Sequence, residues 1–188
     1  MGQQWATPYA TSAVIGSFEI QAGNIAQKAE RWSVAITMLL SALDHIDPVS
    51  DPRLALLAAH NLATTAVDRG QLDLAEYAID RLDGHYEFVA CPKLSLQRRW
   101  LVAEIARRRG HLSEAELLLD AVRGGFIEHG MTLEAADVDL EMAKLAADTG
   151  RPSAAEHLGT RAVRALSAIG APHAAQAALA LFGGKLSA

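Results

Sequence analysis

The stretch RGHLSEAELLLDAV, residues 109–122, recurs in register on both sides of itself. RGQLDLAEYAIDRL occupies residues 69–82, and TGRPSAAEHLGTRAV occupies residues 149–163. Three columns align at a spacing of forty residues: a glycine (Gly70, Gly110, Gly150), an alanine (Ala75, Ala115, Ala155) and a glutamate (Glu76, Glu116, Glu156). A fixed period of this size predicts a stack of similar structural units.

The composition favours packed helices. Apolar residues make up 51% of the 188 residues but aromatic residues only 5%, whereas sheets favour β-branched and aromatic side chains. The net charge of −5 argues against a nucleic-acid or anionic-membrane surface, which would need clustered positive charge. No apolar run reaches the eighteen or so residues that a membrane span needs, and no signal peptide is recognisable. With Cys91 as the single cysteine, no internal disulfide is possible, so we take a reducing, cytoplasmic location as the default.

Each repeat predicts a pair of helices. An apolar-periodic run precedes each anchor glycine, at residues 54–69, 94–109 and 134–149, and a second helix follows it. The glycine ends the first helix because it adopts left-handed geometry without steric cost. Pro52, Pro92 and Pro172 mark helix starts. We also expect Ser113, with Glu116, to form a capping box and the pair Gly124–Gly125 to end a helix.

This frame predicts an all-α solenoid of four antiparallel helix pairs and a closing helix. The repeats span residues 12–51, 52–91, 92–131 and 132–171, and the closing helix spans residues 172–182. A weaker first repeat contributes helices at residues 12–29 and 32–43. Linkers are expected at residues 44–53, 83–93 and 124–132. We expect the whole chain, residues 1–188, to form one such domain.

The chain resembles the tetratricopeptide repeat family over residues 14–182. The resemblance rests on the turn glycines, the second-helix alanines, the run LDHIDP that ends at Pro48, and a small residue in each first helix (Gly23, Ala63, Ala103, Ala143). The chain departs from the family in two ways. Its repeat spans forty residues, whereas the family's repeat spans about 34. At the position of the family's tryptophan it has Ala59, Arg99 and Asp139. The resemblance implies a right-handed superhelix that binds proteins or peptides and has no chemistry of its own.

In that family geometry, first-helix residues would line a concave protein-binding groove. They are Ile20, Asn24, Gln27, His60, Thr64, Val67, Gln97, Trp100, Glu104, Arg107, Leu140 and Lys144. Trp100 and Arg107 lie two turns apart, and both residue types are common at binding hot spots. Two alternatives to a binding role remain open. Trp100 could belong to the core between repeats. The arginines at residues 107–109 could complement the dipole at a helix end instead of binding a ligand carboxylate.

No catalytic or metal-binding pattern is present. The seven histidines never lie three or four residues apart, as zinc ligands on one helix would, and no phosphate-binding loop, dinucleotide-binding fingerprint or nucleophile elbow occurs. We therefore expect a protein that is not an enzyme and that uses no cofactor or metal.

The two ends of the chain are nearly free of charge. Glu19 is the sole charged residue in residues 1–27, and Lys185 is the sole one in residues 165–188. A solenoid in solution needs polar outer faces on its terminal repeats. We therefore expect homo-oligomers that form end to end, as a filament or a ring. The residues expected at this contact are Trp5, Tyr9, Val14, Ile15, Phe18, Leu179, Leu181 and Phe182.

Two other interpretations of the ends stay open: the flanks are disordered or fold back, or a different protein covers one end. The sequence thus predicts a self-associating scaffold. Its alternative is a monomeric adaptor that holds a peptide or a partner protein in the groove.

Overall fold

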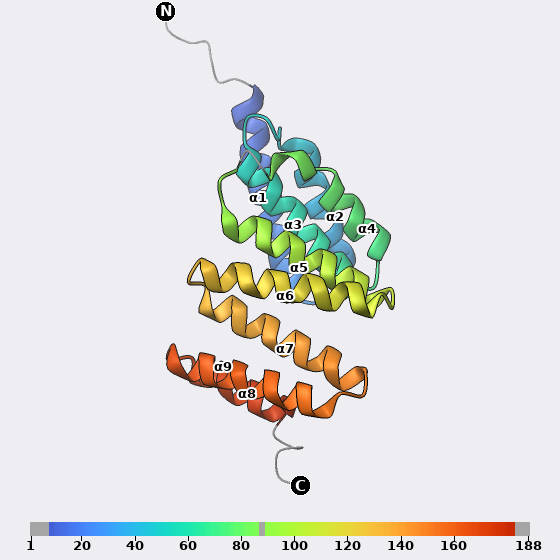
Figure 1. The fold of residues 1–188 in the computed structure, drawn as a ribbon. Helices are drawn as coiled ribbons and strands as arrows, with labels where there is room; N and C mark the ends of the chain where they lie inside the picture. The colour runs from blue at the N-terminus through green and yellow to red at the C-terminus, as the bar shows by residue number, and fades with distance from the viewer. Residues whose placement is uncertain (1–7, 87–88, 183–188) are drawn as a thin grey trace, which may run out of the picture. The chain divides into compact units, whose positions relative to one another are not determined.

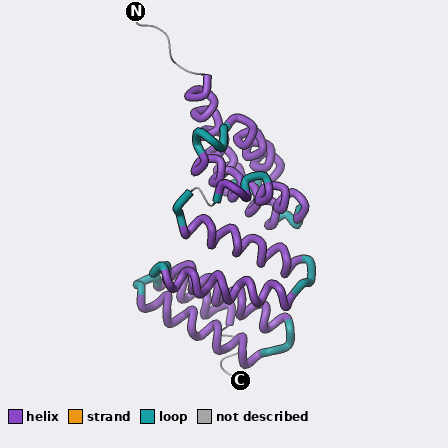
Figure 2. The backbone as a smooth tube through the Cα atoms, turned by 45° about the horizontal axis from the view of Figure 1, so that its top comes forward, coloured by secondary structure: helices purple, strands orange, loops and turns teal. Residues whose placement is uncertain are grey.

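The computed structural model of the chain describes residues 8–86 and 89–182, with side chains described for residues 12–86 and 89–180. Within these ranges every regular element is a helix and no strand occurs (Figure 2). The prediction of an all-α fold is therefore confirmed.

The helices begin at regular intervals along the chain. The elements are α1 (Pro8–Lys28), α2 (Trp32–His45), α3 (Pro52–Asp68), α4 (Leu72–Asp80), the 3₁₀ turn η1 (Asp83–His85), α5 (Pro92–Arg108), α6 (Leu112–Glu128), α7 (Thr132–Asp148), α8 (Pro152–Ala168) and α9 (Pro172–Phe182). Helices α3, α5, α7 and α9 start forty residues apart, and so do α2, α4, α6 and α8. Pro52, Pro92 and Pro172 each occupy the first helical position, where the missing N–H costs nothing.

The described helices group into two compact units, residues 1–101 and 102–188, with the division inside α5. In the first unit α1 packs on α2, α2 on α3 and α3 on α4 (Figure 1). Small residues bring α1 close to α2. A Cβ atom built on Gly16 would lie 2.4 Å from Cγ1 of Ile46, and one on Gly23 would lie 2.8 Å from Cγ of the fully buried Leu39. The small residue expected at position 23 is thus explained by close helix packing.

In the second unit α6 packs on α7, α7 on α8 and α8 on α9 (Figure 1). One cluster of buried residues joins the last three helices and consists mainly of alanine: Ala136, Ala162, Leu166, Ala175 and Ala178. Alanine is the strongest helix former and lets helix axes approach closely, which explains why so few aromatic residues are needed.

Five turns between helices share one geometry. Gly70, Gly110, Gly130, Gly150 and Gly170 have φ between 68° and 83°. At the turn after α6, the N–H of Met131 donates to the carbonyl of Phe126 at 2.8 Å, and the N–H of Gly130 donates to that of Ile127 at 3.0 Å. These two bonds define a Schellman motif, which satisfies carbonyls at the helix end. The predicted helix ends at Gly70, Gly110 and Gly150 are confirmed. The helix ends at Gly130 and Gly170 were not predicted.

Two local predictions were wrong. Gly124 and Gly125 do not end a helix, because α6 runs through them to Glu128 and stops at the Gly130 turn. The residues between 124 and 128 are therefore helical and not a linker. Ser113 is the second residue of α6 and not its cap, since the cap is His111, whose side chain makes no capping bond.

Glu116, the expected partner in that capping box, has a different role. Its carboxylate accepts two hydrogen bonds from the guanidinium of Arg151, at 2.8 and 3.0 Å. The pair joins α6 to the start of α8. Glu116 therefore has a structural role between α6 and α8.

Glu30 occupies the turn after α1 at the place where the five turns described above have glycine, and its φ is 57°. A side chain with a Cβ is strained there by about 1 kcal/mol. Glu30→Gly should therefore stabilise the protein by about 1 kcal/mol in urea unfolding followed by circular dichroism. Glu30→Ala, which removes the carboxylate but keeps the Cβ, should change the stability little. Equal gains from both variants would attribute the effect to charge and contradict the prediction.

Candidate functional site

The outer side of α1 carries exposed apolar side chains. Val14, Ile15, Phe18 and Ile25 are 54%, 41%, 67% and 69% exposed, and Ala22 lies exposed among them. We call these five residues the α1 face. Contiguous exposed apolar patches larger than a few hundred Å² are rare on monomers and mark interaction sites.

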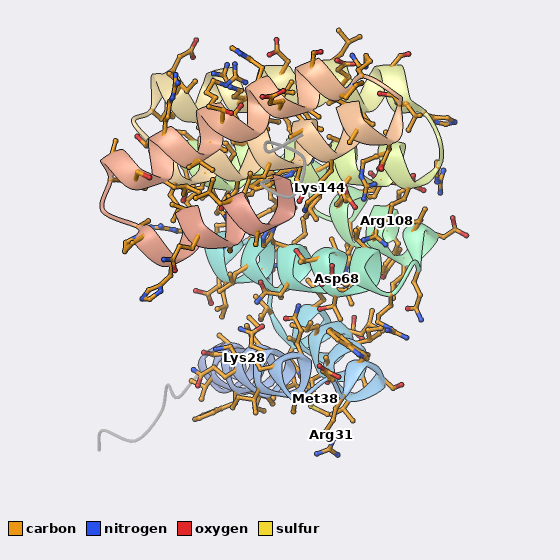
Figure 3. The ribbon with its side chains drawn as sticks, turned by 90° about the horizontal axis from the view of Figure 1, so that it is seen from below. Lys28, Arg31, Met38, Asp68, Arg108 and Lys144 are labelled. Carbon is orange, nitrogen blue, oxygen red and sulfur yellow. The ribbon has the colours of Figure 1, made fainter. Side chains whose placement is uncertain are left out.

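The single carboxylate of the described part of α1 points away from this face. Glu19 accepts a hydrogen bond from the Ser41 hydroxyl at 2.6 Å and lies 2.8 Å from Nδ1 of His45, both on α2. Its side chain is only 17% exposed. The nearest cations in sequence are Lys28, at the C-terminal end of α1, and Arg31, in the turn that follows (Figure 3). The α1 face is therefore uncharged along its length.

The residues predicted for self-association have different positions. Val14, Ile15 and Phe18 lie on the α1 face, and Leu179 is 44% exposed on α9. Helix α9 packs on α8 through Ala175 and Ala178, and Leu179 follows Ala175 by one helical turn. Trp5 lies outside the described residues, as do the side chains of Tyr9, Leu181 and Phe182.

Of the residues predicted to line a groove, several belong to the first unit. Ile20 and Val67 were wrongly assigned to a solvent-facing groove, because each is 3% exposed and belongs to the core. Asn24 accepts a hydrogen bond from the amide of Asn61 at 2.9 Å, which joins α1 to α3. The remaining residues, Gln27, His60, Thr64, Gln97 and Trp100, are all partly buried.

His60 and Thr64 lie one turn apart on α3. The hydroxyl of Thr64 donates to the backbone carbonyl of His60 at 2.9 Å, so this donor is already used within the helix. Burial lowers the pKa of His60 below its ordinary value, because the charged imidazolium loses solvation. His60 is therefore a neutral residue at pH 7.

An apolar hollow of about 770 Å³ lies beside the first turns of α3 and α5 in the first unit. Its walls include Leu54, Leu57 and Leu94, and Arg53 and Lys93 stand at its edge together with Gln97. Of the predicted groove residues, the hollow includes Gln97. The hollow could receive an apolar side chain of a bound peptide.

In the second unit the cations at the end of α5 are held by a carboxylate. Arg107 donates two hydrogen bonds to Glu104, at 2.8 and 2.7 Å, and Arg108 donates a third at 2.8 Å. Burial alone would raise the pKa of Glu104, but the hydrogen bonds from both arginines outweigh it and the pKa is lowered. Arg107 therefore binds within its own helix in this structure and would have to release Glu104 to clamp a ligand carboxylate.

Helix α7 carries acidic residues on one side together with Lys144. Lys144 donates to Glu141 at 2.7 Å, one turn away. The pKa of Asp137 is raised, first by burial and then by the negative charges of Glu134 and Glu141. Leu140 is partly buried against the alanine cluster of the second unit.

The raised pKa of Asp137 has a definite effect on stability. The folded protein binds the Asp137 proton more tightly than the unfolded chain, so ionisation destabilises the fold as the pH rises through this pKa. Asp137→Asn should therefore stabilise the protein at pH 7, by less than about 1 kcal/mol because the side chain still reaches solvent. The gain should vanish below the ordinary aspartate pKa of about 3.9. Urea unfolding at pH 7 and at about pH 3.5 measures this, with the exposed Asp120→Asn as control.

A buried ionic network in the second unit was not predicted from the sequence. Asp139 on α7 is 3% exposed. It accepts hydrogen bonds from Nε of Arg123 on α6 at 2.6 Å, and from Nε and Nη2 of Arg161 on α8 at 2.8 and 2.5 Å. One carboxylate thus joins three consecutive helices. The departure from the family pattern at position 139 was visible in the sequence, but the two arginines that face it were not.

Among the residues with described side chains, no group of three or more His, Cys, Asp or Glu is placed to hold a metal ion. None of the described helices is both long and apolar enough to cross a membrane. No protein-family model matches the chain, and no curated protein is significantly similar to it.

Proposed function

We propose that this protein is a non-catalytic helical-repeat scaffold that associates with itself end to end through its terminal helices. Its architecture would be a tetratricopeptide-like, right-handed solenoid of four antiparallel helix pairs and a closing helix. The observation that carries the proposal is the α1 face. Four large apolar side chains are exposed on one helix, and the one carboxylate of its described part is turned towards α2.

Burial of this face against another protein surface would be favourable by about 25 cal/mol per Å² of apolar area removed from water. Helix α9 would provide the second contact, since it contains no Asp, Glu, Lys or Arg and exposes Leu179. Contacts at both ends of a chain propagate, so the assembly would be a filament or another open-ended oligomer.

Light scattering coupled to size exclusion, over a range of protein concentrations, tests the proposal. The protein should show a mass above that of one 20.0 kDa chain, and the mass should rise with concentration. Phe18→Glu should return it towards the monomer, since a carboxylate would then be buried without a partner. Leu117→Glu is the matched control, because Leu117 is 75% exposed on α6, which is not a terminal helix. A monomer at every concentration would exclude the scaffold function.

The apolar hollow beside α3 and α5 favours a second candidate, a monomeric adaptor that binds a peptide or a partner protein. Selection from a library of displayed peptides tests it. Peptides that bind the native protein should be lost with Leu57→Arg, since Leu57 lines the hollow and is 40% exposed. Leu117→Arg, at an exposed position on α6, should leave binding unchanged. If no peptide shows this dependence, the groove has no such role.

A further inference from the structure

We infer that the α1 face pairs with the α1 face of a second copy of this chain, with the two helices antiparallel and crossing near Gln21 and Ala22. This inference rests on the proposed self-association and names its contact. The contact is between like surfaces, so it differs from one in which α1 of one copy meets α9 of the next.

The spacing of the exposed residues suits a helix–helix contact. Ile15, Phe18, Ala22 and Ile25 follow one another at intervals of three, four and three residues. This is the spacing with which a straight seam of side chains packs into a second helix. Ala22 is the small residue near the middle of the seam, and it lets the two helix axes approach closely.

An antiparallel pairing makes the face complementary to itself. Phe18 and Ile25 lie equally far from the point between Gln21 and Ala22, so Phe18 of one copy would pack on Ile25 of the other. Such a two-fold contact uses the same patch on both copies and closes without leaving half of it exposed.

Charge at the ends of the helix favours the antiparallel direction. In a parallel pair the two copies of Lys28 would lie together and the helix dipoles would be aligned, and both effects are unfavourable. In the antiparallel pair each Lys28 comes opposite Ile15, along which its aliphatic stem can lie while the ammonium group stays in water.

Of the two terminal helices, α1 is the better partner for this face. Neither the α1 face nor α9 carries an Asp, Glu, Lys or Arg side chain, so charge does not distinguish them. Among the described side chains, α9 exposes one large apolar residue, Leu179, whereas α1 exposes four such residues. Pairing of α1 with itself therefore removes more apolar surface from water.

Disulfide trapping tests this pairing on the full chain. The background is Cys91→Ser, which removes the natural thiol. Ala22→Cys in this background places a thiol next to the two-fold axis, within reach of its symmetry mate. Mild oxidation should give a covalent dimer, and the additional change Phe18→Glu should abolish it. Ser113→Cys, an exposed position on α6, is the control for random collision and should give no more than a trace.

The outcomes separate this inference from the proposed function. If light scattering shows oligomers but Ala22→Cys forms no dimer, the like-to-like contact is overturned and the scaffold function stands. A crosslink formed only after mixing Ala22→Cys with Leu179→Cys would show a contact of α1 with α9 and also overturn the inference. A chain that is monomeric at all concentrations would overturn both.

Discussion

Asp139→Ala should destabilise the protein by about 3 kcal/mol, the lower end of the range for breaking a buried ion pair. The Asp139 side chain is 5% exposed, and its carboxylate is the acceptor for three hydrogen bonds from two arginines. Without it, Arg123 and Arg161 would keep their charges with most of their solvation lost, since their side chains are only 21% and 34% exposed. The part of each arginine side chain that still reaches water keeps the cost from being larger.

Urea unfolding followed by far-ultraviolet circular dichroism measures this change. Asp120→Ala, at an exposed position on α6, is the control and should alter the stability by less than about 0.5 kcal/mol. The triple change Asp139→Leu, Arg123→Met and Arg161→Met should recover most of the loss, because a network replaced by packed apolar groups is often neutral. A loss below about 1 kcal/mol for Asp139→Ala would show that the network contributes little to the fold.

Phe126→Ala should have an effect of similar size, with a loss of about 3–5 kcal/mol. Phe126 is fully buried, and it continues the buried stripe of Ala115, Leu119 and Val122 along α6. The truncation would leave a cavity, because the neighbouring helices can move only partly into the space of the lost ring. The cost then contains both the lost transfer energy of the ring and the cavity itself.

The next residue is a matched control for this change. Ile127 is also apolar and lies on the same turn of α6, but it is 52% exposed. Ile127→Ala should therefore change the stability by less than about 0.5 kcal/mol in the same unfolding experiment. Comparable losses for the two variants would mean that α6 does not pack as the structure describes.

The positions of these residues show what the sequence could predict. Helix starts and three helix ends followed from the forty-residue columns, because proline and left-handed glycine act locally and need no knowledge of the fold. Gly130 and Gly170 act in the same local way. They end the second helices of their repeats, whereas the aligned glycines at residues 70, 110 and 150 end first helices.

The wrong prediction at Gly124 and Gly125 has a different cause. Each glycine costs about 1 kcal/mol in a helix compared with alanine, so an end at this pair was reasonable from propensity alone. Burial of Phe126 and the Schellman bonds at Gly130 favour the longer helix by more than this cost. Tertiary packing therefore decided the end of α6.

The candidate interaction surface was predicted only in part. The absence of charge from the N-terminal segment was visible in the sequence. The direction in which Glu19 points was not, since it depends on Ser41 and His45 more than twenty residues away. The same holds for Asp139, whose partners lie 16 and 22 residues away in the sequence. Contacts over such separations depend on the angles between helices, which repeat spacing does not determine.

The alanine-rich interior has a consequence for the mutational tolerance of this protein. Residues such as Ala35, Ala59 and Ala162 are completely buried, yet truncation has almost nothing to remove from them. Enlargement is the damaging change, since one added methylene group or more in a close-packed interior costs about 1–3 kcal/mol. A saturation library should therefore be depleted of valine and leucine at these sites more strongly than of serine and glycine, the reverse of the profile of a leucine-rich interior.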